Sequence, residues 1–483
     1  MTTISETVRC DALIAGERVA PGDVFEDVDP ATGNVLAEVA RCGAAEIDGA
    51  VAAAREAFAR DWSGRSPSAR ADVLQRIAEL IRKHHEELVR LESLDTGKPI
   101  SQARADIAVS ARYFDFYART IESVYGDTVP IGPDIFVYTL REPHGVTGHI
   151  IPWNYPAQMV GRTIAPALAA GNCCVLKPAE EAPLSAIRIA ELALEAGLPP
   201  GAFNVVPGLG EEAGAALASH SGIDHLSFTG STEVGRLVAK AAADNIVPVT
   251  VELGGKSPHV VLADADLERA VPTIVRSIIQ NAGQTCSAGS RVLVQSEVHE
   301  PLRDAVTRSF VGLRLGPGLE DPDLGPLITE RQRFRVASLV EQGRQQARLV
   351  TGGGPPSEER LRDGFFFSPT LFDEVPPEAP IAQEEIFGPV LVMTHFDGLD
   401  EAAALANATP YGLVAGIWTR DVSTAHRLAR EIQAGQVFVN SYGAGGGVEL
   451  PFGGQKRSGY GREKGLEGLL AFTRTKTVAV DLG

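Results

Sequence analysis

The sequence has few of the features that define several classes of protein. Among 483 residues there are only five cysteines, at positions 10, 42, 173, 174 and 286, and they have neither the even number nor the spacing of a disulfide framework or a zinc site. No apolar run approaches the roughly 20 residues of a membrane span, and the N-terminus lacks the basic and apolar regions of a secretory signal. We therefore expect a reduced, cytoplasmic protein that holds no metal.

Basic side chains are also in the minority. The chain has 44 Lys and Arg residues against 62 Asp and Glu residues, which gives a formal net charge of −18. A surface of this charge repels nucleic-acid backbones and anionic lipids, so nucleic acid and membranes are poor candidate partners. We expect the partner to be a small molecule, bound by a chain whose length suggests about two to four domains.

Hydrophobic spacing predicts two regions of alternating strands and helices. Helices are expected over 44–60 and 68–94, and a strand–helix alternation follows from residue 146. The predicted strands of this alternation are 146–151, 173–177, 203–206 and 225–229, and its predicted helices are 156–170, 185–196, 211–219 and 231–243. The alternation indicates a mostly parallel sheet that binds ligands beyond the carboxyl ends of its strands. A second α/β region follows Glu252, with a helix over 267–281 and an edge strand at 436–440.

The standard dinucleotide fingerprint Gly-x-Gly-x-x-Gly is absent. Between a predicted strand and a predicted helix, residues 228–235 read FTGSTEVG instead. Gly230 would permit a tight turn, and Ser231 would cap the helix whose free N–H groups can bind a pyrophosphate. Taken alone, this octapeptide fits a purely structural turn equally well.

Two other segments carry groups suited to covalent chemistry. Residues 251–258 read VELGGKSP and place a single carboxylate, Glu252, after an apolar run. Residues 280–289 read QNAGQTCSAG and place Cys286 among small and amide residues. A base and a thiol nucleophile are the groups that a thioester mechanism requires. Together the segments resemble the signatures of the NAD(P)-dependent aldehyde dehydrogenase superfamily, hydrolytic type, and the resemblance covers nearly the whole chain.

The resemblance implies a mechanism and its catalytic residues. Cys286 would add to an aldehyde carbon, and after hydride loss the resulting thioester would be hydrolysed by water that Glu252 activates. Asn154, in the segment IPWNYP at 151–156, would donate to the oxyanion. Glu463 would orient Glu252 or relay its proton, although an Arg-Glu pair in a glycine-rich segment is equally often a structural ion pair.

The same resemblance implies a cofactor site for NAD. Lys177 and Glu180 would bind the adenosine ribose, and because that carboxylate repels a 2′-phosphate, NAD is favoured and NADP is the alternative. Glu385 would bind the nicotinamide ribose, and Phe387 would pack against the nicotinamide. The other cofactor-binding residues expected are Ile151, Pro152, Trp153, Gly210, Gly230, Ser231, Val234 and Leu253.

The implied fold is the α/β, aldehyde dehydrogenase-like fold, with two parallel α/β domains and a small oligomerisation β-element. Its expected boundaries are 1–121 and 142–253 for NAD binding, 254–453 for catalysis, and 122–141 and 470–483 for oligomerisation. A hairpin within 125–138 and a terminal strand at 476–480 would pair across subunits and build a homodimer or homotetramer.

Arg162 bears on the choice of aldehyde. It lies nine positions after Trp153, where betaine aldehyde dehydrogenases carry an aromatic residue that helps to cage an ammonium group, so betaine aldehyde is disfavoured. Succinic semialdehyde and aromatic-aldehyde dehydrogenases share an arginine here, but Gln280 stands where the former commonly carry a second one. We predict an aromatic or otherwise bulky, neutral-to-acidic aldehyde that contacts Arg162 and Tyr155. A succinic-type semialdehyde is the alternative, as is an Arg162 that binds only protein groups.

Three rival functions fit the sequence less well. A cysteine hydrolase would need a histidine partner, and none of the ten histidines lies in a recognisable setting. An acylating dehydrogenase would lack Glu252. A non-enzymatic, crystallin-like structural protein would usually have lost the Cys, Glu or Asn signature, and all three are intact.

Overall fold

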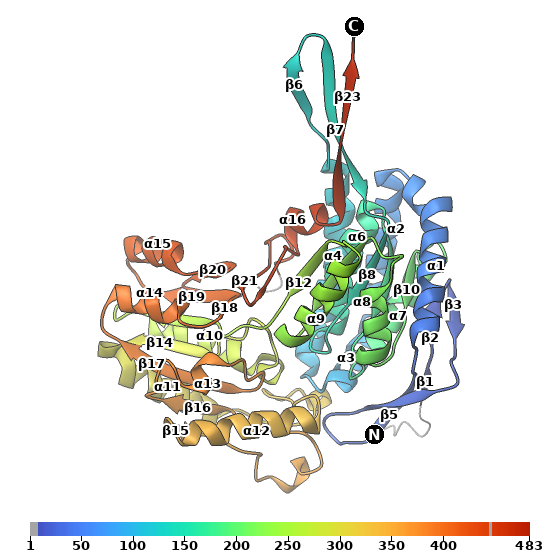
Figure 1. Cartoon of the computed structure of the whole chain (residues 1–483). Helices are drawn as coiled ribbons and strands as arrows, with labels where there is room; N and C mark the ends of the chain where they lie inside the picture. Colours follow the sequence, from blue (N-terminus) through green and yellow to red (C-terminus); the bar gives the residue numbers. More distant parts are fainter. Residues whose placement is uncertain (1–7, 444–446) are drawn as a thin grey trace.

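The computed structural model describes residues 8–443 and 447–483, and Figure 1 shows two α/β lobes below a projecting β-arm. The first lobe is built on an eight-stranded sheet whose five central strands are parallel. In sheet order its strands are β22 (Gly459–Tyr460), β12 (Val249–Glu252), β11 (His225–Thr229), β8 (Val146–Ile150), β9 (Cys173–Lys177), β10 (Phe203–Val205), β2 (Ala12–Ile14) and β3 (Glu17–Val19). The predicted parallel sheet is thus confirmed.

Helices cover the two faces of this sheet. They are α1 (Ala44–Arg60), α2 (Pro67–Lys83), α3 (His85–Thr96), α4 (Ile100–Thr120), α6 (Ala165–Ala170), α7 (Leu184–Glu195), α8 (Ala215–Ser219) and α9 (Thr232–Asp244). Because both faces are covered, β9 and β11 are buried at every residue, as expected for parallel strands. Cys173 and Cys174 lie fully buried in β9 and pack as small apolar side chains.

The helix predicted over 68–94 is in fact two helices, α2 and α3, separated at His84. The apolar spacing runs across the break, so periodicity alone could not locate it. Charge does mark it, because α2 ends on Arg82 and Lys83 while α3 begins with Glu86 and Glu87. Each sign suits the dipole of the helix end at which it lies.

The helix predicted over 156–170 is interrupted by a wider turn. It consists of α5 (Pro156–Met159), a π-helical turn over Val160–Ile164, and α6. Such turns within α-helices often occur at functional sites. Arg162 lies in the middle of this one.

The second lobe is built on a seven-stranded sheet. In sheet order its strands are β15 (Arg348–Thr351), β16 (Thr370–Asp373), β17 (Val390–Phe396), β14 (Arg291–Gln295), β13 (Pro258–Val261), β19 (Val414–Trp418) and β20 (Gln436–Val439). All pairs are parallel except β15 with β16, and β20 forms an edge, as predicted. Its helices are α10 (Leu267–Ile279), α11 (His299–Val311), α12 (Glu330–Arg344), α13 (Pro380–Gln383), α14 (Leu399–Asn407) and α15 (Val422–Glu431).

Three short elements complete the lobes. A small sheet contains β1 (Val8–Cys10), β5 (Val35–Ala40) and β4 (Val24–Val28), and a two-stranded ladder joins β18 (Tyr411–Gly412) to β21 (Gln455–Lys456). Helix α16 (Gly465–Leu470) leads into the arm. None of the helices over 8–443 and 447–483 is long and apolar enough to cross a membrane.

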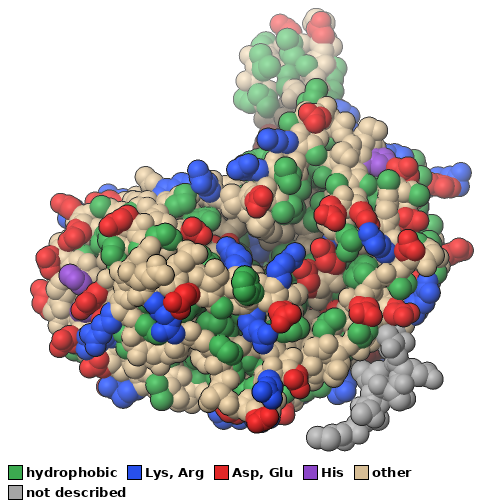
Figure 2. Space-filling view, turned by 60° about the horizontal axis from the view of Figure 1, so that its bottom comes forward, with side chains coloured by type: hydrophobic (Ala, Val, Ile, Leu, Met, Phe, Trp, Pro, Cys, Tyr) green, Lys and Arg blue, Asp and Glu red, His purple; other side chains and the backbone are tan. Residues whose placement is uncertain are grey.

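The arm consists of β6 (Thr128–Gly132), β7 (Ile135–Pro143) and β23 (Thr473–Asp481). Strand β23 pairs antiparallel with β7 from Thr473 opposite Pro143 to Asp481 opposite Ile135. Apolar side chains are exposed along it, and Figure 2 shows them gathered on the arm. The large exposed apolar side chains of the arm include those of Ile131, Ile135, Phe136, Leu140 and Val480.

Candidate active site

Cys286 follows a backbone segment of unusual conformation. Helix α10 ends at Ile279, two residues earlier than predicted, and Asn281, Ala282 and Gly283 then adopt positive φ angles of 48°, 54° and 73°. Non-glycine residues rarely adopt this left-handed conformation, and it persists only where the surroundings impose it. At position 283 a Cβ atom would lie 2.2 Å from the Gly388 carbonyl oxygen, so this position requires glycine.

Hydrogen bonds from three directions hold the cysteine loop in place. The buried Gln284 side chain donates to the Asn281 carbonyl oxygen (3.1 Å) and accepts from the Ile328 N–H (2.9 Å). The Asn154 amide donates to the Gln284 carbonyl oxygen (2.9 Å), and the Tyr155 hydroxyl is 2.7 Å from the Thr285 hydroxyl. The predicted nucleophile and the predicted oxyanion donor are therefore fixed to each other.

The Cys286 thiol lines a cavity of about 550 Å³ between the two lobes. Burial raises the pKa of this thiol to about 11, although the charge of Arg162 favours the thiolate. Within residues 8–443 and 447–483, no acceptor takes the backbone N–H of Cys286. That N–H and the second amide hydrogen of Asn154 are available to an oxyanion formed on a substrate at the thiol.

A buried charge cluster supports Asn154 from behind. The Lys98 ammonium contacts Asp106 Oδ2 (2.5 Å) and Glu92 Oε1 (3.3 Å), and it donates to the Asn154 carbonyl oxygen (3.0 Å). It also lies 4.6 Å from the centre of the Tyr155 ring. The Lys98 side chain has no exposed surface, so the charged groups that support Asn154 and Tyr155 are shielded from solvent.

We expect Lys98→Met to lower the free energy of unfolding by about 3–5 kcal/mol, because two carboxylates would stay buried without a cation. Urea denaturation with circular dichroism would measure the loss. The double variant Lys98→Met, Asp106→Asn should recover part of it, since one uncompensated charge is removed. Equal stability of Lys98→Met and the unmodified protein would contradict a supporting role for the cluster.

The two predicted acidic catalytic residues share one guanidinium. The Arg162 Nε atom contacts Glu463 Oε2, and an Arg162 terminal nitrogen lies 4.0 Å from Glu252 Oε2. Burial raises the pKa of Glu252 well above its usual value, and the charge of Glu463 adds to this effect while Arg162 opposes it. Both Glu252 oxygens are buried, and neither has a hydrogen-bond partner among the described residues. Glu463 also accepts from the Ser227 hydroxyl (3.2 Å).

The predicted adenosine-side residues lie at the carboxyl ends of neighbouring parallel strands, β8, β9 and β11. Lys177 pairs with Glu180 (2.6 Å), and Lys177 is buried, so it is not the exposed charge pair that the local sequence alone would suggest. Burial disfavours the Glu180 charge, but Lys177 holds the pKa of Glu180 below its usual value. Ile151 and Pro152 directly follow β8, while Gly210 lies opposite Glu180.

The Gly-Ser turn joins β11 to α9 as predicted. The Ser231 hydroxyl caps α9 by accepting from the Val234 N–H (3.2 Å), and Val234 is 45% exposed. A Cβ on Gly235 would lie 2.4 Å from Leu253, so glycine allows this close packing. Gly230 donates to the Glu252 carbonyl oxygen (3.1 Å), which ties the turn to the catalytic strand.

The nicotinamide-side residues come from the second lobe. Glu385 accepts from the Gly255 N–H (3.0 Å), and burial raises its pKa to about 7. Phe387 has a positive φ of 58° and packs edge-on against Trp153, with ring centres 5.3 Å apart. The Gln332 amide donates to the Phe387 carbonyl oxygen (2.7 Å) and thereby supports this conformation.

This donor set fits a dinucleotide. In the first turn of α9 Ser231 takes the Val234 N–H, and the N–H groups before it remain for a diphosphate. Carboxylates stand on both lobes to accept from ribose hydroxyls. The buried Thr229 hydroxyl, at the end of β11, has no partner among the described residues. Its free donor faces the same edge of the sheet.

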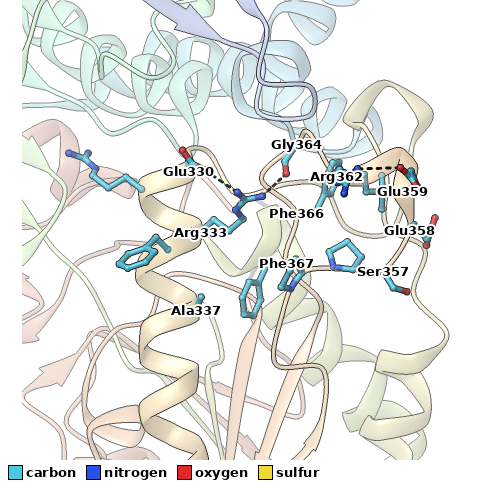
Figure 3. Close-up of a pocket in the computed structure, with 15 residues that line it drawn as sticks. Glu330, Arg333, Ala337, Ser357, Glu358, Glu359, Arg362, Gly364, Phe366 and Phe367 are labelled. Carbon is cyan, nitrogen blue, oxygen red and sulfur yellow. Dashed lines mark hydrogen bonds and ion pairs between the residues drawn. The ribbon is translucent and has the colours of Figure 1, made fainter.

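A larger cavity, of about 840 Å³, lies beside α12 and contains none of the predicted site residues (Figure 3). Its arginines are paired with protein carboxylates: Arg333 with Glu330 (3.2 Å), and Arg362 with Glu359 (3.3 Å). Size alone would therefore have selected the wrong cavity.

Sequence reasoning missed three residues of the site. Lys98 stands between Gly97 and Pro99, a context typical of an exposed turn, and Gln284 carries no signal beyond its closeness to Cys286. Lys464 follows the predicted Glu463 and lines the Cys286 cavity. The segment 441–449 contributes Tyr442 to this cavity, and its residues 444–446 lie outside the described part of the chain.

The two-sheet fold thus brings a thiol and a dinucleotide-type sheet edge together between the lobes, as in oxidoreductases of the α/β class. The profile of the aldehyde dehydrogenase family matches residues 19–478. The hydroxyisobutyraldehyde dehydrogenase of Mycolicibacterium austroafricanum is 41% identical over 95% of this chain and 91% of its own length.

Solved structures give the same result. A Burkholderia cenocepacia structure of the aldehyde dehydrogenase type is 54% identical, with a TM-score of 0.96 over 98% of this chain and all of that one. An aldehyde dehydrogenase from Bacillus cereus in complex with NAD⁺ is 42% identical, with a TM-score of 0.96 over 99% of this chain and 97% of that one. The chain belongs to the aldehyde dehydrogenase family, and the predicted fold and enzyme class, an oxidoreductase acting on aldehydes, are confirmed.

Proposed function

We propose that this protein oxidises an aldehyde to a carboxylic acid with NAD, through a thioester on Cys286. The observation that carries the proposal is the fixed relation between Cys286 and Asn154, whose amide donates to the carbonyl oxygen two residues before the cysteine. A thiol at a cavity, a donor held by the same loop, and a buried carboxylate whose charge acts on the thiol are the groups that acyl chemistry requires.

In this proposal each residue has one task. The Cys286 sulfur attacks the carbonyl carbon, and the Asn154 amide with the Cys286 N–H stabilises the oxyanion. The bound nicotinamide supplies the hydride acceptor. Glu252 then takes a proton from water, which attacks the thioester and releases the acid and the thiol. Glu463 and Arg162 position Glu252 and balance its charge.

NAD is the proposed cofactor because Glu180 meets Lys177 where an adenosine ribose would lie, and its carboxylate would repel a 2′-phosphate. NADP is the alternative. Glu385 would accept from the second ribose, and Trp153 and Phe387 would flank the nicotinamide. The Bacillus cereus relative, solved with NAD⁺, supports this assignment.

The finer substrate prediction, an aromatic or bulky, neutral-to-acidic aldehyde, rests on the cavity wall. Tyr155, Phe438, Tyr442 and Phe452 surround the thiol with rings. Arg162 also lines the cavity, but its guanidinium contacts Glu463 and lies 4.3 Å from the centre of the Phe452 ring. The charge of Arg162 is therefore directed to a protein carboxylate, and its guanidinium lies against an aromatic ring of the cavity wall.

The first experiment measures NADH formation at 340 nm with a panel of benzaldehyde, hydroxybenzaldehydes, hexanal, succinic semialdehyde, γ-aminobutyraldehyde and betaine aldehyde. We expect the aromatic aldehydes to give the highest kcat/KM and betaine aldehyde the lowest, because a cationic substrate would meet Arg162 and Lys464. Parallel assays with NADP measure cofactor preference. Absence of NADH formation with every aldehyde would contradict the proposal.

We infer that the arm mediates assembly into a homodimer or homotetramer. Strand β23 covers one edge of β7, and the other arm strand, β6, leaves an edge open to pairing. Exposed apolar residues such as Ile131 and Phe136 line the arm. Such a surface is unfavourable in water, and a second subunit would cover it.

A further inference from the structure

Two of the cations that line the Cys286 cavity form no ion pair among the residues that the structure describes. Four charged side chains line this cavity. Two of them are paired, Asp106 with Lys98 and Arg162 with Glu463. The other two, Lys464 and Arg276, have no ion-pair partner within residues 8–443 and 447–483. A chain with a net charge of −18 has thus placed two cations without an ion-pair partner among the described residues in the cavity of its predicted nucleophile, although the charges of Glu463 and Glu252 act on Lys464.

Lys464 is held rigidly in this position. Its neighbour Glu463 forms an antiparallel bridge with Phe452, with N–H to carbonyl distances of 2.7 and 2.8 Å. Lys464 itself adopts a left-handed backbone with φ of 59°, which a lysine rarely does. Its ammonium lies 5.1 Å from the centre of the Phe452 ring, and the Arg162 guanidinium lies 4.3 Å from the same centre. The ammonium therefore packs against a ring of the cavity wall.

The ammonium of Lys464 remains charged near neutral pH. Burial and the charge of Arg162 lower its pKa to about 8, while Cys286, Glu463 and Glu252 oppose this shift. An ammonium that is partly desolvated and lacks a carboxylate partner gains from binding an anion. The other cavity provides the contrast, because its arginines Arg333 and Arg362 already have carboxylate partners.

Arg276 extends the positive charge toward the mouth of the cavity. It is exposed, near the end of α10, and lines the same cavity as the thiol. An anion arriving from solvent would meet Arg276 first and Lys464 farther in. The same cavity is lined by aromatic side chains, among them Tyr155, Phe438 and Tyr442, that would contact the uncharged part of a substrate.

We propose that the aldehyde substrate carries an anionic group, a carboxylate or its equivalent, and that Lys464 is the residue that binds it. Arg276 assists at the entrance. The inference rests on the proposed aldehyde oxidation at Cys286 and narrows it to aldehydes with an acidic group. Succinic semialdehyde dehydrogenases commonly carry a second arginine where this chain has Gln280. In this inference Lys464 supplies that second positive charge.

The charge at the thiol can be tested without turnover. Iodoacetate and iodoacetamide alkylate the same thiolate but differ in charge, so the ratio of their rates at Cys286 reports the local cation and cancels any change in thiol pKa. We expect Lys464→Met to lower the iodoacetate-to-iodoacetamide rate ratio about tenfold. Mass spectrometry of the Cys286 peptide follows both reactions. The exposed Lys83→Met, with the same change of charge away from this cavity, is the matched control and should leave the ratio unchanged.

Substrate preference gives the second test. 4-Carboxybenzaldehyde and its methyl ester share the ring and the aldehyde and differ in charge. We expect the acid to have the higher kcat/KM, and Lys464→Met to reduce the acid-to-ester ratio about tenfold, mainly through KM. Arg276→Gln should reduce the ratio less, and Lys83→Met should not change it.

The two tests separate this inference from the proposed function. If the unmodified protein oxidises the ester at least as well as the acid, or Lys464→Met keeps the ratio, the anion site is wrong and the dehydrogenase stands. If no aldehyde is oxidised, the proposed function fails. An unchanged alkylation ratio in Lys464→Met would contradict, independently of turnover, the claim that the Lys464 charge acts at the thiol.

Discussion

Replacement of Cys286 by alanine is expected to reduce kcat for aldehyde oxidation by about 10⁴-fold or more, because the thioester route is lost with its nucleophile. The substitution removes only a sulfur atom at a half-exposed position, so the fold should persist. Steady-state NADH formation at 340 nm measures the loss. Binding of NAD, followed by quenching of protein fluorescence, should be retained because the cofactor residues are elsewhere.

Cys10→Ala is the matched control for this substitution. Cys10 is also partly exposed, but it ends β1, lines no part of the Cys286 cavity, and burial raises its pKa to about 11. Its replacement should leave turnover within twofold of the unmodified protein. Substantial NADH formation by Cys286→Ala would show that another group attacks the aldehyde.

Replacement of Glu252 by glutamine should separate the two halves of the reaction. Acylation of Cys286 would still occur, so a rapid burst of about one NADH per site should precede a steady state slowed by about 10²-fold or more, the usual contribution of a general base. Stopped-flow absorbance measures both phases. Since Gln keeps the size of the side chain but cannot accept the proton, the effect reports chemistry and not packing.

Two further measurements make this result specific. Burial and the charge of Glu463 raise the pKa of Glu252, so steady-state turnover of the unmodified protein should rise with pH as Glu252 loses its proton. The Glu252→Gln variant should not show this rise.

Added hydroxylamine should cleave the thioester that accumulates in Glu252→Gln and restore part of the turnover. The exposed Glu378→Gln serves as the control. Unchanged steady-state turnover would remove Glu252 from the role of base.

The comparison of sequence and structure turns on particular residues. Alternation of strand-like and helix-like segments was enough to predict β8, β9, β11 and the helices between them. Strands covered on both faces are buried along nearly their whole length, even where β8 and β11 carry polar residues. The pattern failed at His84, where two helices meet without a change in apolar spacing, and at the π-helical turn that presents Arg162.

By itself, the sequence determined the class of chemistry. Cys286, Glu252 and Asn154 stand in short segments whose residue types can do little else together, and the resemblance they carry named the family. What only the tertiary structure decided is how charges are paired. Lys98 was placed behind Asn154, and Arg162 between Glu252 and Glu463. Lys464 was placed in the Cys286 cavity with no ion-pair partner among the described residues.

The physical reason is the range of the interactions. Strand and helix patterns depend on neighbours along the chain, so they can be read locally. Ion pairs join residues that are far apart in sequence, such as Arg162 with Glu463, and their strength depends on burial that no local pattern encodes. The two lobes and the segment that carries Glu463 and Lys464 come together around Cys286. Only this arrangement decides which cation can bind a substrate.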